Sequence, residues 1–440
     1  MKRYLKHVLT AAVALSAFAG HAWSGQLLAG AAKASITPAA DEFPYQTMTE
    51  KPFVGVHDDI FARALALDDS DGHKALIISV EVTAIPDPDA IVTAIATATG
   101  LPAKSILVVA THTHGVPLTF FHSAHANPTE QREIDRIRAQ VVAVARDALD
   151  HMRPATLAFV RGEAFVNTNN GEQAGRKFWY DPTGSSDKTL DIVRIDGLDG
   201  KPLALMLNYA SHGEVMFRSV TKDGGYEVTG DLPGAVSRIL ESQPSGAPVV
   251  LFTAAAEGDQ LPLFKSLQPD AELPGTDEGA AGWGVLDLQA RRLAMAAIDT
   301  LAAAPAGAAQ VYLSTASGGI RCPGQHYNVD HETHKLIGID ETGPVTIPVS
   351  VLRLNDIVLG GIGADIASDI GRSVKTASPK PDTMVLTMTA GSVGYVLNDA
   401  AYAHPTHGVM GSPVKPGCAT QALSTELNSL LKSSLAQPAQ

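Results

Sequence analysis

Five apolar segments of the sequence each end in small residues that are followed by side chains able to bind a metal or move a proton. Residues 107–110, 205–210, 249–255, 357–362 and 384–390 lead into His112 and His114, His212, Asp259, Asp365 and Tyr395, in that order. In α/β folds, binding sites form at the carboxyl ends of strands, where the following loops converge. The pattern therefore predicts that these five strand ends build one common pocket.

The residue types in this group match the ligands that zinc prefers. Zinc is bound by histidine nitrogens and carboxylate oxygens in tetrahedral sites, and a catalytic site leaves one position for water. His112, His212 and Asp365 supply two imidazoles and one carboxylate. Each motif alone also has a structural explanation, since an aspartate at a helix start is often a cap. The prediction of a zinc centre rests on the occurrence of the three together.

The elements that would position these residues alternate between strand and helix. Residues 75–83 form a β-rich apolar run, whereas residues 129–152 and 284–303 have helical apolar spacing. A hairpin is expected between residues 190–195 and 203–209, because Asp and Gly residues supply the turn. We therefore predict a single large α/β domain with a mixed, largely parallel sheet covered by helices, and with the site at the strand carboxyl ends.

The N-terminus has the three parts of a secretory signal peptide. Three basic residues among the first six precede an apolar run over residues 8–20, and small residues follow. This run is shorter than the ~20 residues of a membrane-spanning helix, and no later segment qualifies either. We expect residues 1–24 to be a signal peptide and residues 25–440 to be one exported domain, periplasmic or secreted, without a stable membrane span.

Charge and cysteine content restrict the possible partners. The formal net charge is −13, and an acidic protein repels phosphate backbones, so nucleic acid is not expected as a partner. The two cysteines are Cys322 and Cys418. An oxidising compartment would permit a disulfide between them, and two free buried thiols are the alternative. The sequence leaves the oligomeric state open.

Six short motifs occur in an order that resembles one enzyme family. They are residues 31–38 (AAKASITP), 56–68 (VHDDIFARALALD), 108–115 (VVATHTHG), 208–213 (NYASHG), 229–234 (TGDLPG) and 257–262 (EGDQLP). This series resembles the catalytic domain of the neutral/alkaline, non-lysosomal ceramidases and covers nearly all of the chain after residue 24. The resemblance implies a zinc site and hydrolysis of an N-acyl linkage in a small or lipid-like substrate. Long members of the family append an immunoglobulin-like module, which we do not expect in a chain of this length.

The resemblance also implies roles for individual residues. It places the first two zinc ligands at His112 and His212. The zinc glutamate of the family falls on Asp365, which is one methylene shorter, and the zinc tyrosine falls on Tyr395. His114 matches the second histidine of its motif, which lies beside the metal in the family.

One position departs from the family pattern. The family has a catalytic serine in a Gly-Asp-x-Ser-Pro loop, but residues 258–262 read GDQLP, so that Leu261 replaces the serine. Leucine can neither attack a carbonyl nor hold a proton. The resemblance therefore implies a branch of the family with an altered mechanism or substrate.

These observations lead to the hypothesis of a zinc hydrolase that attacks its acyl bond with a metal-activated water. Zinc polarises the carbonyl and lowers the pKa of its water to about 7, so that attack needs no serine. His114 is the expected proton carrier, since the pKa of a free imidazole is about 6.5. Asp259 would orient His114 or the water, or hold a turn. Tyr395 would bind zinc or donate to the developing oxyanion.

Two other classes of function stay open at this point. A non-catalytic ligand-binding protein on the same fold would account for Leu261, and protein ligands would then fill all four zinc positions. A metal-dependent ester or phosphoester hydrolase with two ions would draw extra ligands from His57, Asp58 and Asp59.

Overall fold

The structure is a computed structural model. It describes residues 25–46, 50–117, 126–171, 180–244, 246–267, 276–330 and 336–435. The predicted signal peptide lies outside the described residues. Among those described, no helix is both long and apolar enough to cross a membrane.

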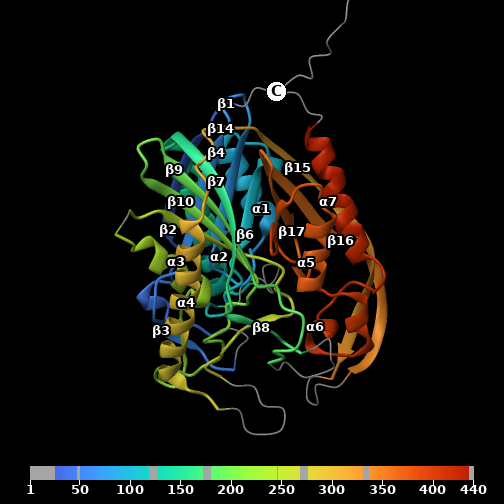
Figure 1. Cartoon of the computed structure of the whole chain (residues 1–440). Helices are drawn as coiled ribbons and strands as arrows, with labels where there is room; N and C mark the ends of the chain where they lie inside the picture. Colours follow the sequence, from blue (N-terminus) through green and yellow to red (C-terminus); the bar gives the residue numbers. More distant parts are fainter. Residues whose placement is uncertain are drawn as a thin grey trace, which may run out of the picture.

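An eight-stranded mixed sheet forms one part of the molecule, with strand order β12-β10-β9-β7-β2-β4-β5-β6 (Figure 1). Its strands are β2 (Leu28–Ser35), β4 (Phe61–Asp68), β5 (Lys74–Val80), β6 (Ile106–Ala110), β7 (Arg153–Glu163), β9 (Thr189–Gly197), β10 (Pro202–Tyr209) and β12 (Val249–Ala254). The expected hairpin is confirmed, because β9 and β10 pair antiparallel.

The prediction of a largely parallel sheet is wrong. Within the large sheet, β5–β6 and β10–β12 pair in parallel, and the other neighbouring strands pair antiparallel. The physical reason is the length of the connections. Residues 69–73 and 198–201 are too short for a crossover, and a short turn joins antiparallel strands.

A second sheet of four strands, in the order β15-β16-β17-β19, completes a shared core. Its strands are β15 (Leu313–Val329), β16 (Leu336–Leu354), β17 (Ile357–Ile362) and β19 (Asp382–Leu386). In the large sheet, β2 and β7 pair over only two residues, and β12 also packs against β4 and β5. The large sheet therefore folds back on itself. Apolar side chains from both halves of the large sheet and from the small sheet fill the core between them, among them Leu65, Ile77, Met206, Leu251 and Leu359.

Helices cover the outer faces of the two sheets, and α5 and α7 lie on the small sheet (Figure 1). The helices are α1 (Pro88–Thr99), α2 (Pro128–Asp150), α3 (Asp231–Glu241), α4 (Gly282–Ala302), α5 (Ser368–Ala377), α6 (His407–Met410) and α7 (Ala419–Leu435). The long helix predicted near residues 129–152 is confirmed as α2. Asn127 caps its start, and Ile134, Ile137, Val141 and Val144 are buried along one face.

Short strands connect the loops that surround the strand ends. They are β1 (Gly25–Gln26), β3 (Phe53–Val56), β8 (Asn167–Asn169), β11 (Tyr226–Val228), β13 (Gln260–Pro262), β14 (Gln310–Val311), β18 (Asp365–Ile366) and β20 (Tyr395–Val396). A disulfide joins Cys322 in β15 to Cys418, the residue before α7. Of the two alternatives that the sequence left open for the cysteines, the structure has the disulfide.

Candidate metal centre

The strand ends that the sequence singles out meet at the segment that follows β19. Thr387 N donates to Ala254 O at the end of β12, and Thr389 N donates to Ile362 O at the end of β17. Ala390 N donates to Val108 O in β6. The end of β10 joins them, because Tyr209 O accepts from the amide that follows β12. The loops that follow these strands therefore begin close to one another.

A short backbone bridge locks the loops of His112 and His212 together. His114 N donates to Gly213 O at 2.8 Å, and Gly213 N donates to His112 O at 3.3 Å. A Cβ on Gly213 would lie 2.8 Å from Thr113 Cα, so only glycine allows this approach. His112 has a φ of 58°, a left-handed conformation that non-glycine residues rarely adopt and that clusters at functional sites.

Three imidazoles and one carboxylate converge at this bridge. The ligand atoms of His112, His114 and His212 all lie within 4.8 Å of one another. Asp365 Oδ2 lies 3.4 Å from His212 Nε2 and 3.7 Å from His112 Nε2. Tetrahedral Zn–N bonds of about 2.0–2.1 Å separate two ligand atoms by roughly 3.4 Å. The structure thus brings the predicted ligands His112, His212 and Asp365 to separations that fit one zinc ion.

Backbone carbonyls fix the protonation of two of these rings. His112 Nδ1 lies 2.6 Å from Thr83 O, and His212 Nδ1 lies 3.0 Å from Gln260 O. A carbonyl oxygen only accepts, so each Nδ1 carries a proton and each Nε2 is the ring atom left to bind a cation. Metal-bound histidines are oriented in this way in proteins.

The centre holds unpaired buried polar atoms that a cation would satisfy. His212 Nε2 and Asp365 Oδ1 are buried and make no hydrogen bond within the described part of the chain. Burial lowers the pKa of His212, but the neighbouring Asp365 carboxylate outweighs burial and raises that pKa to about 10. Burial raises the pKa of Glu257 well above its ordinary value. The centre therefore stabilises an added positive charge, and this donor set fits zinc.

Tyr395 lies beside Asp365 at the border of the centre. The two residues are direct partners in the parallel pairing of β18 with β20. The Tyr395 ring also meets the His407 ring edge-on at 5.8 Å between centroids. His407 and its neighbour His404 are exposed. The structure therefore places Tyr395 next to the predicted carboxylate ligand, and its role stays a prediction.

The Asp259 carboxylate accepts hydrogen bonds at the start of α5. Its two carboxylate oxygens accept from Ser368 N at 2.8 Å, Ser368 Oγ at 3.1 Å, Asn169 Nδ2 at 3.1 Å and Gln260 Nε2 at 3.0 Å. A carboxylate at a helix N-terminus also interacts favourably with the helix dipole. These contacts support the turn-holding role for Asp259 rather than the orientation of His114.

Sequence reasoning missed two charged residues behind His114. Glu214 Oε1 lies 3.2 Å from His114 Nδ1, and Glu214 Oε2 lies 2.7 Å from Lys265 Nζ. Burial acts to raise the pKa of Glu214, but Lys265 and His114 outweigh it and hold that pKa far below its ordinary value. Burial lowers the pKa of His114 well below its ordinary value. Glu214 carried a signal, since it follows His212 by two positions, whereas nothing in the sequence around Lys265 marks it.

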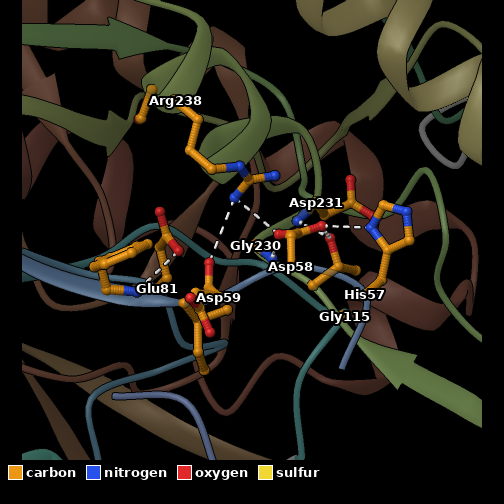
Figure 2. A network of polar contacts seen from close by, with 12 residues as sticks. His57, Asp58, Asp59, Glu81, Gly115, Gly230, Asp231 and Arg238 are labelled. Carbon is orange, nitrogen blue, oxygen red and sulfur yellow. Dashed lines mark hydrogen bonds and ion pairs between the residues drawn. The ribbon is translucent and has the colours of Figure 1, made fainter. Parts of the chain in front are cut away.

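His57 and Asp58, which were considered as ligands of a second metal, form hydrogen bonds and ion pairs within the protein instead (Figure 2). Asp58 accepts from Thr229 Oγ1 at 2.7 Å and Gly230 N at 3.0 Å, and it pairs with Arg238 Nη1 at 2.8 Å. His57 Nδ1 contacts the same carboxylate at 2.8 Å. With its oxygens occupied in this way, Asp58 supports the loop before α3 and is a poor candidate for a metal ligand.

The chain is similar to neutral ceramidases in part of its sequence and in its fold, although no family profile matches it. Neutral ceramidases B and A of Dictyostelium discoideum are 26% and 24% identical over 233 and 238 residues, which is 47% of this chain. The alignments span only about a third of those relatives, 31% and 32% of their lengths. The crystal structure of neutral ceramidase from Pseudomonas aeruginosa superposes with a TM-score of 0.75 at 15% identity, over 94% of this chain and 76% of that one. A ceramidase complexed with C2 gives the same values.

The chain is therefore similar to neutral ceramidases, in sequence over about half of its length and in fold over nearly all of it. Its likeness to the solved neutral ceramidase covers both sheets, because it includes nearly the whole chain. Leu261, which departs from the motif that the resemblance implies, lies inside the fold rather than on a surface loop. Leu261 is buried in β13, directly opposite Thr168 of β8. The residue at the position where the family resemblance implies a serine is thus a buried leucine.

Proposed function

We propose that this chain is an exported zinc-dependent hydrolase that cleaves the N-acyl amide bond of a small or lipid-like substrate. The observation that carries the proposal is the convergence of His112, His212 and Asp365, with both histidine Nδ1 atoms held by carbonyls. The amide bond is inferred from the relatives, which are named neutral ceramidases.

In this proposal, His112 Nε2, His212 Nε2 and Asp365 hold the metal, and Tyr395 is the fourth ligand or an oxyanion donor. When bound, zinc would polarise the substrate carbonyl and activate water. The Thr83 and Gln260 carbonyls keep the two rings in the ligand tautomer. Asp365 contributes the negative charge that offsets the cation.

His114 is proposed to carry the proton between water and the leaving amine. Its Nε2 faces the centre, 3.2 Å from His112 Nε2, and its Nδ1 faces Glu214. Nε2 would take the proton from the attacking water and pass it to the amine nitrogen. No protein nucleophile takes part, which agrees with Leu261 at the position of the family serine.

Export is supported by two independent features of the chain. One is the basic and apolar N-terminal segment of the sequence. The other is the Cys322–Cys418 disulfide, a bond that persists in oxidising compartments. Together they favour a periplasmic or secreted protein.

A ligand-binding protein without hydrolase activity is the second candidate. The observation in its favour is Leu261, which is buried at the position where the family resemblance implies a catalytic serine. Such a protein would retain the metal and the fold but release no product.

Metal analysis combined with a substrate panel separates the two candidates. We would compare wild type, His112→Ala and His212→Ala, with His151→Ala as a control because His151 is exposed at the end of α2. N-acyl lipids, N-acyl amino acids and simple esters form the panel. About one zinc per chain, lost in the first two variants only, and turnover of an N-acyl substrate would support the hydrolase. Bound zinc without any turnover would favour the binding protein, and absence of zinc binding would reject both.

A further inference from the structure

A buried ion pair between Glu214 and Lys265 lies on the Nδ1 side of the His114 ring, opposite the Nε2 atom that faces the centre. Glu214 contacts His114 Nδ1 through one carboxylate oxygen, at 3.2 Å, and Lys265 Nζ through the other, at 2.7 Å. The side chains of Glu214 and Lys265 are 3% and 6% exposed. A buried ion pair of this kind rarely adds net stability, because the desolvation of both charges opposes their attraction. Its presence beside the centre therefore calls for a role other than stability.

The backbone around the pair fixes its position from several sides. Asp231 accepts from Val215 N at 3.0 Å and from Met216 N at 2.8 Å, which holds the chain just after Glu214. Ser266 N donates to Val215 O at 2.7 Å, which ties the Lys265 loop to the same segment. The three residues His114, Glu214 and Lys265 therefore have little freedom to separate.

An aromatic ring packs against two members of the cluster. The Phe217 ring meets the His114 ring edge-on, with 5.1 Å between centroids, and the Lys265 ammonium lies over the same Phe217 ring at 5.6 Å. Phe217 thus packs against both ends of the row formed by His114, Glu214 and Lys265.

We propose that Glu214, held in place by Lys265, is a positioning residue that fixes the tautomer and orientation of His114 for proton transfer. A carboxylate accepts hydrogen bonds only, so His114 keeps its proton on Nδ1 and presents the Nε2 lone pair to the centre. The Nδ1–Glu214 contact is not well aligned in this structure, which is common for catalytic hydrogen bonds before substrate binds. This inference rests on the proposed hydrolase function.

Lys265 gives the pair a second effect. Glu214 follows His212 by two residues, and a free carboxylate there would compete for the cation. The ion pair with Lys265 engages Glu214 Oε2 and directs the carboxylate toward His114 instead. With Leu261 in place of a serine, His114 is the group left to take a proton from water, so its orientation decides the rate.

The test removes the pair without leaving a buried charge behind. The double variant Glu214→Leu with Lys265→Met replaces both residues by apolar ones of similar size, a change that buried pairs often tolerate. The control is Asp356→Leu with Lys380→Met, an ion pair whose aspartate is exposed and which joins the turn between β16 and β17 to the turn before β19. Zinc content, thermal unfolding, kcat and KM are measured for both, for His114→Ala and for wild type.

We expect every protein to hold about one zinc per chain and the Glu214/Lys265 variant to lose about 10–100-fold in kcat with KM unchanged, which is typical of a lost partner behind a functional histidine. His114→Ala should lose about 10²–10⁴-fold. A double variant with wild-type kcat would overturn the inference. Loss of zinc in His114→Ala would also overturn it, because His114 would then be a metal ligand.

A second readout is independent of turnover and of the double variant. In ¹⁵N-histidine-labelled wild type, NMR should show His114 protonated on Nδ1, and in Glu214→Gln this preference should weaken, because an amide can also donate. Protonation of wild-type His114 on Nε2 would overturn the inference even if no substrate were turned over. Failure of the hydrolase proposal is recognised separately, as a zinc-bound wild type that cleaves nothing on the panel.

Discussion

At the scale of single residues, the charge of Asp365 is the feature of the proposed metal centre that should most affect cation binding. Its Oδ2 lies within 3.7 Å of both His112 Nε2 and His212 Nε2. We predict that Asp365→Asn lowers zinc affinity, because the amide keeps the shape of the carboxylate but loses its charge. The loss should exceed the factor of about 10–100 that is typical when a partner behind a metal ligand is removed. Competition with a chelator measures the affinity. The exposed Asp356→Asn is the control, and equal affinities for the two variants would contradict the assignment of Asp365 as a ligand.

Leu261 gives a second prediction at the scale of single residues. Because it is buried in β13, Leu261→Ser removes core volume and should lower the free energy of unfolding by about 2–5 kcal/mol. Restoring the serine should not raise kcat if water is the nucleophile. Chemical unfolding and steady-state kinetics on the same N-acyl substrate test both parts. A clear rise in kcat would show that the chain still has the machinery for a serine mechanism.

Residue types at strand ends were sufficient to predict that His112, His212 and Asp365 lie together, because strand ends converge, and their binding of zinc stays a prediction. The partners of His114 were not predictable to the same degree. Lys265 follows its strand as an ordinary loop lysine, and only the fold brings it to Glu214, 51 positions away. Asp259 shows the opposite case, since a polar residue at a strand end turned out to hold the start of α5.

At the scale of elements, periodicity predicted α2 and the β9–β10 hairpin, since both depend on neighbouring residues. The strand–helix alternation predicted a largely parallel sheet, whereas short connections such as residues 69–73 join antiparallel neighbours. The return of β12 onto β4 and β5 could not have been derived from local sequence. It depends on the packing of distant strands and on the short pairing between β2 and β7.

Helix α2 carries a buried carboxyl group whose ionisation should make stability depend on pH. Glu133 is 2% exposed, and burial raises its pKa to about 7. The unfolded chain ionises near 4.5, so the folded state binds the proton more tightly, and Glu133 contributes stability at low pH that is lost as pH rises from about 4.5 to 7. We predict that Glu133→Gln stabilises the protein by up to about 3 kcal/mol at pH 8 and has little effect at pH 4.

Denaturant unfolding of wild type and Glu133→Gln at pH 4, 6 and 8 measures this difference. Asp135→Asn, an exposed change on the same helix, is the control. A stability difference that stays constant across these pH values would show that Glu133 does not titrate in this range.

At the scale of the whole molecule, two distant parts are held by the Cys322–Cys418 disulfide. The bond joins the β15–β16 hairpin to the start of α7, across 96 positions of sequence. The metal centre draws on other parts, the ends of β6 and β10 and the short strand β18. The disulfide and the centre should therefore be separable, one acting on global stability and the other on chemistry.

We accordingly predict that replacing both cysteines by serine lowers the free energy of unfolding by about 2–5 kcal/mol, because a cross-link over a long loop restricts the unfolded chain. Zinc content at 25 °C and KM should be unchanged, since the ligand atoms are positioned by the strand ends and the Thr113–Gly213 bridge. Denaturant unfolding with parallel metal analysis makes the comparison, and wild type treated with a reductant should reproduce the variant. Loss of zinc at denaturant concentrations well below the unfolding transition would instead mean that the small sheet, which carries Asp365 just beyond β17, needs the disulfide to keep its place against the large one.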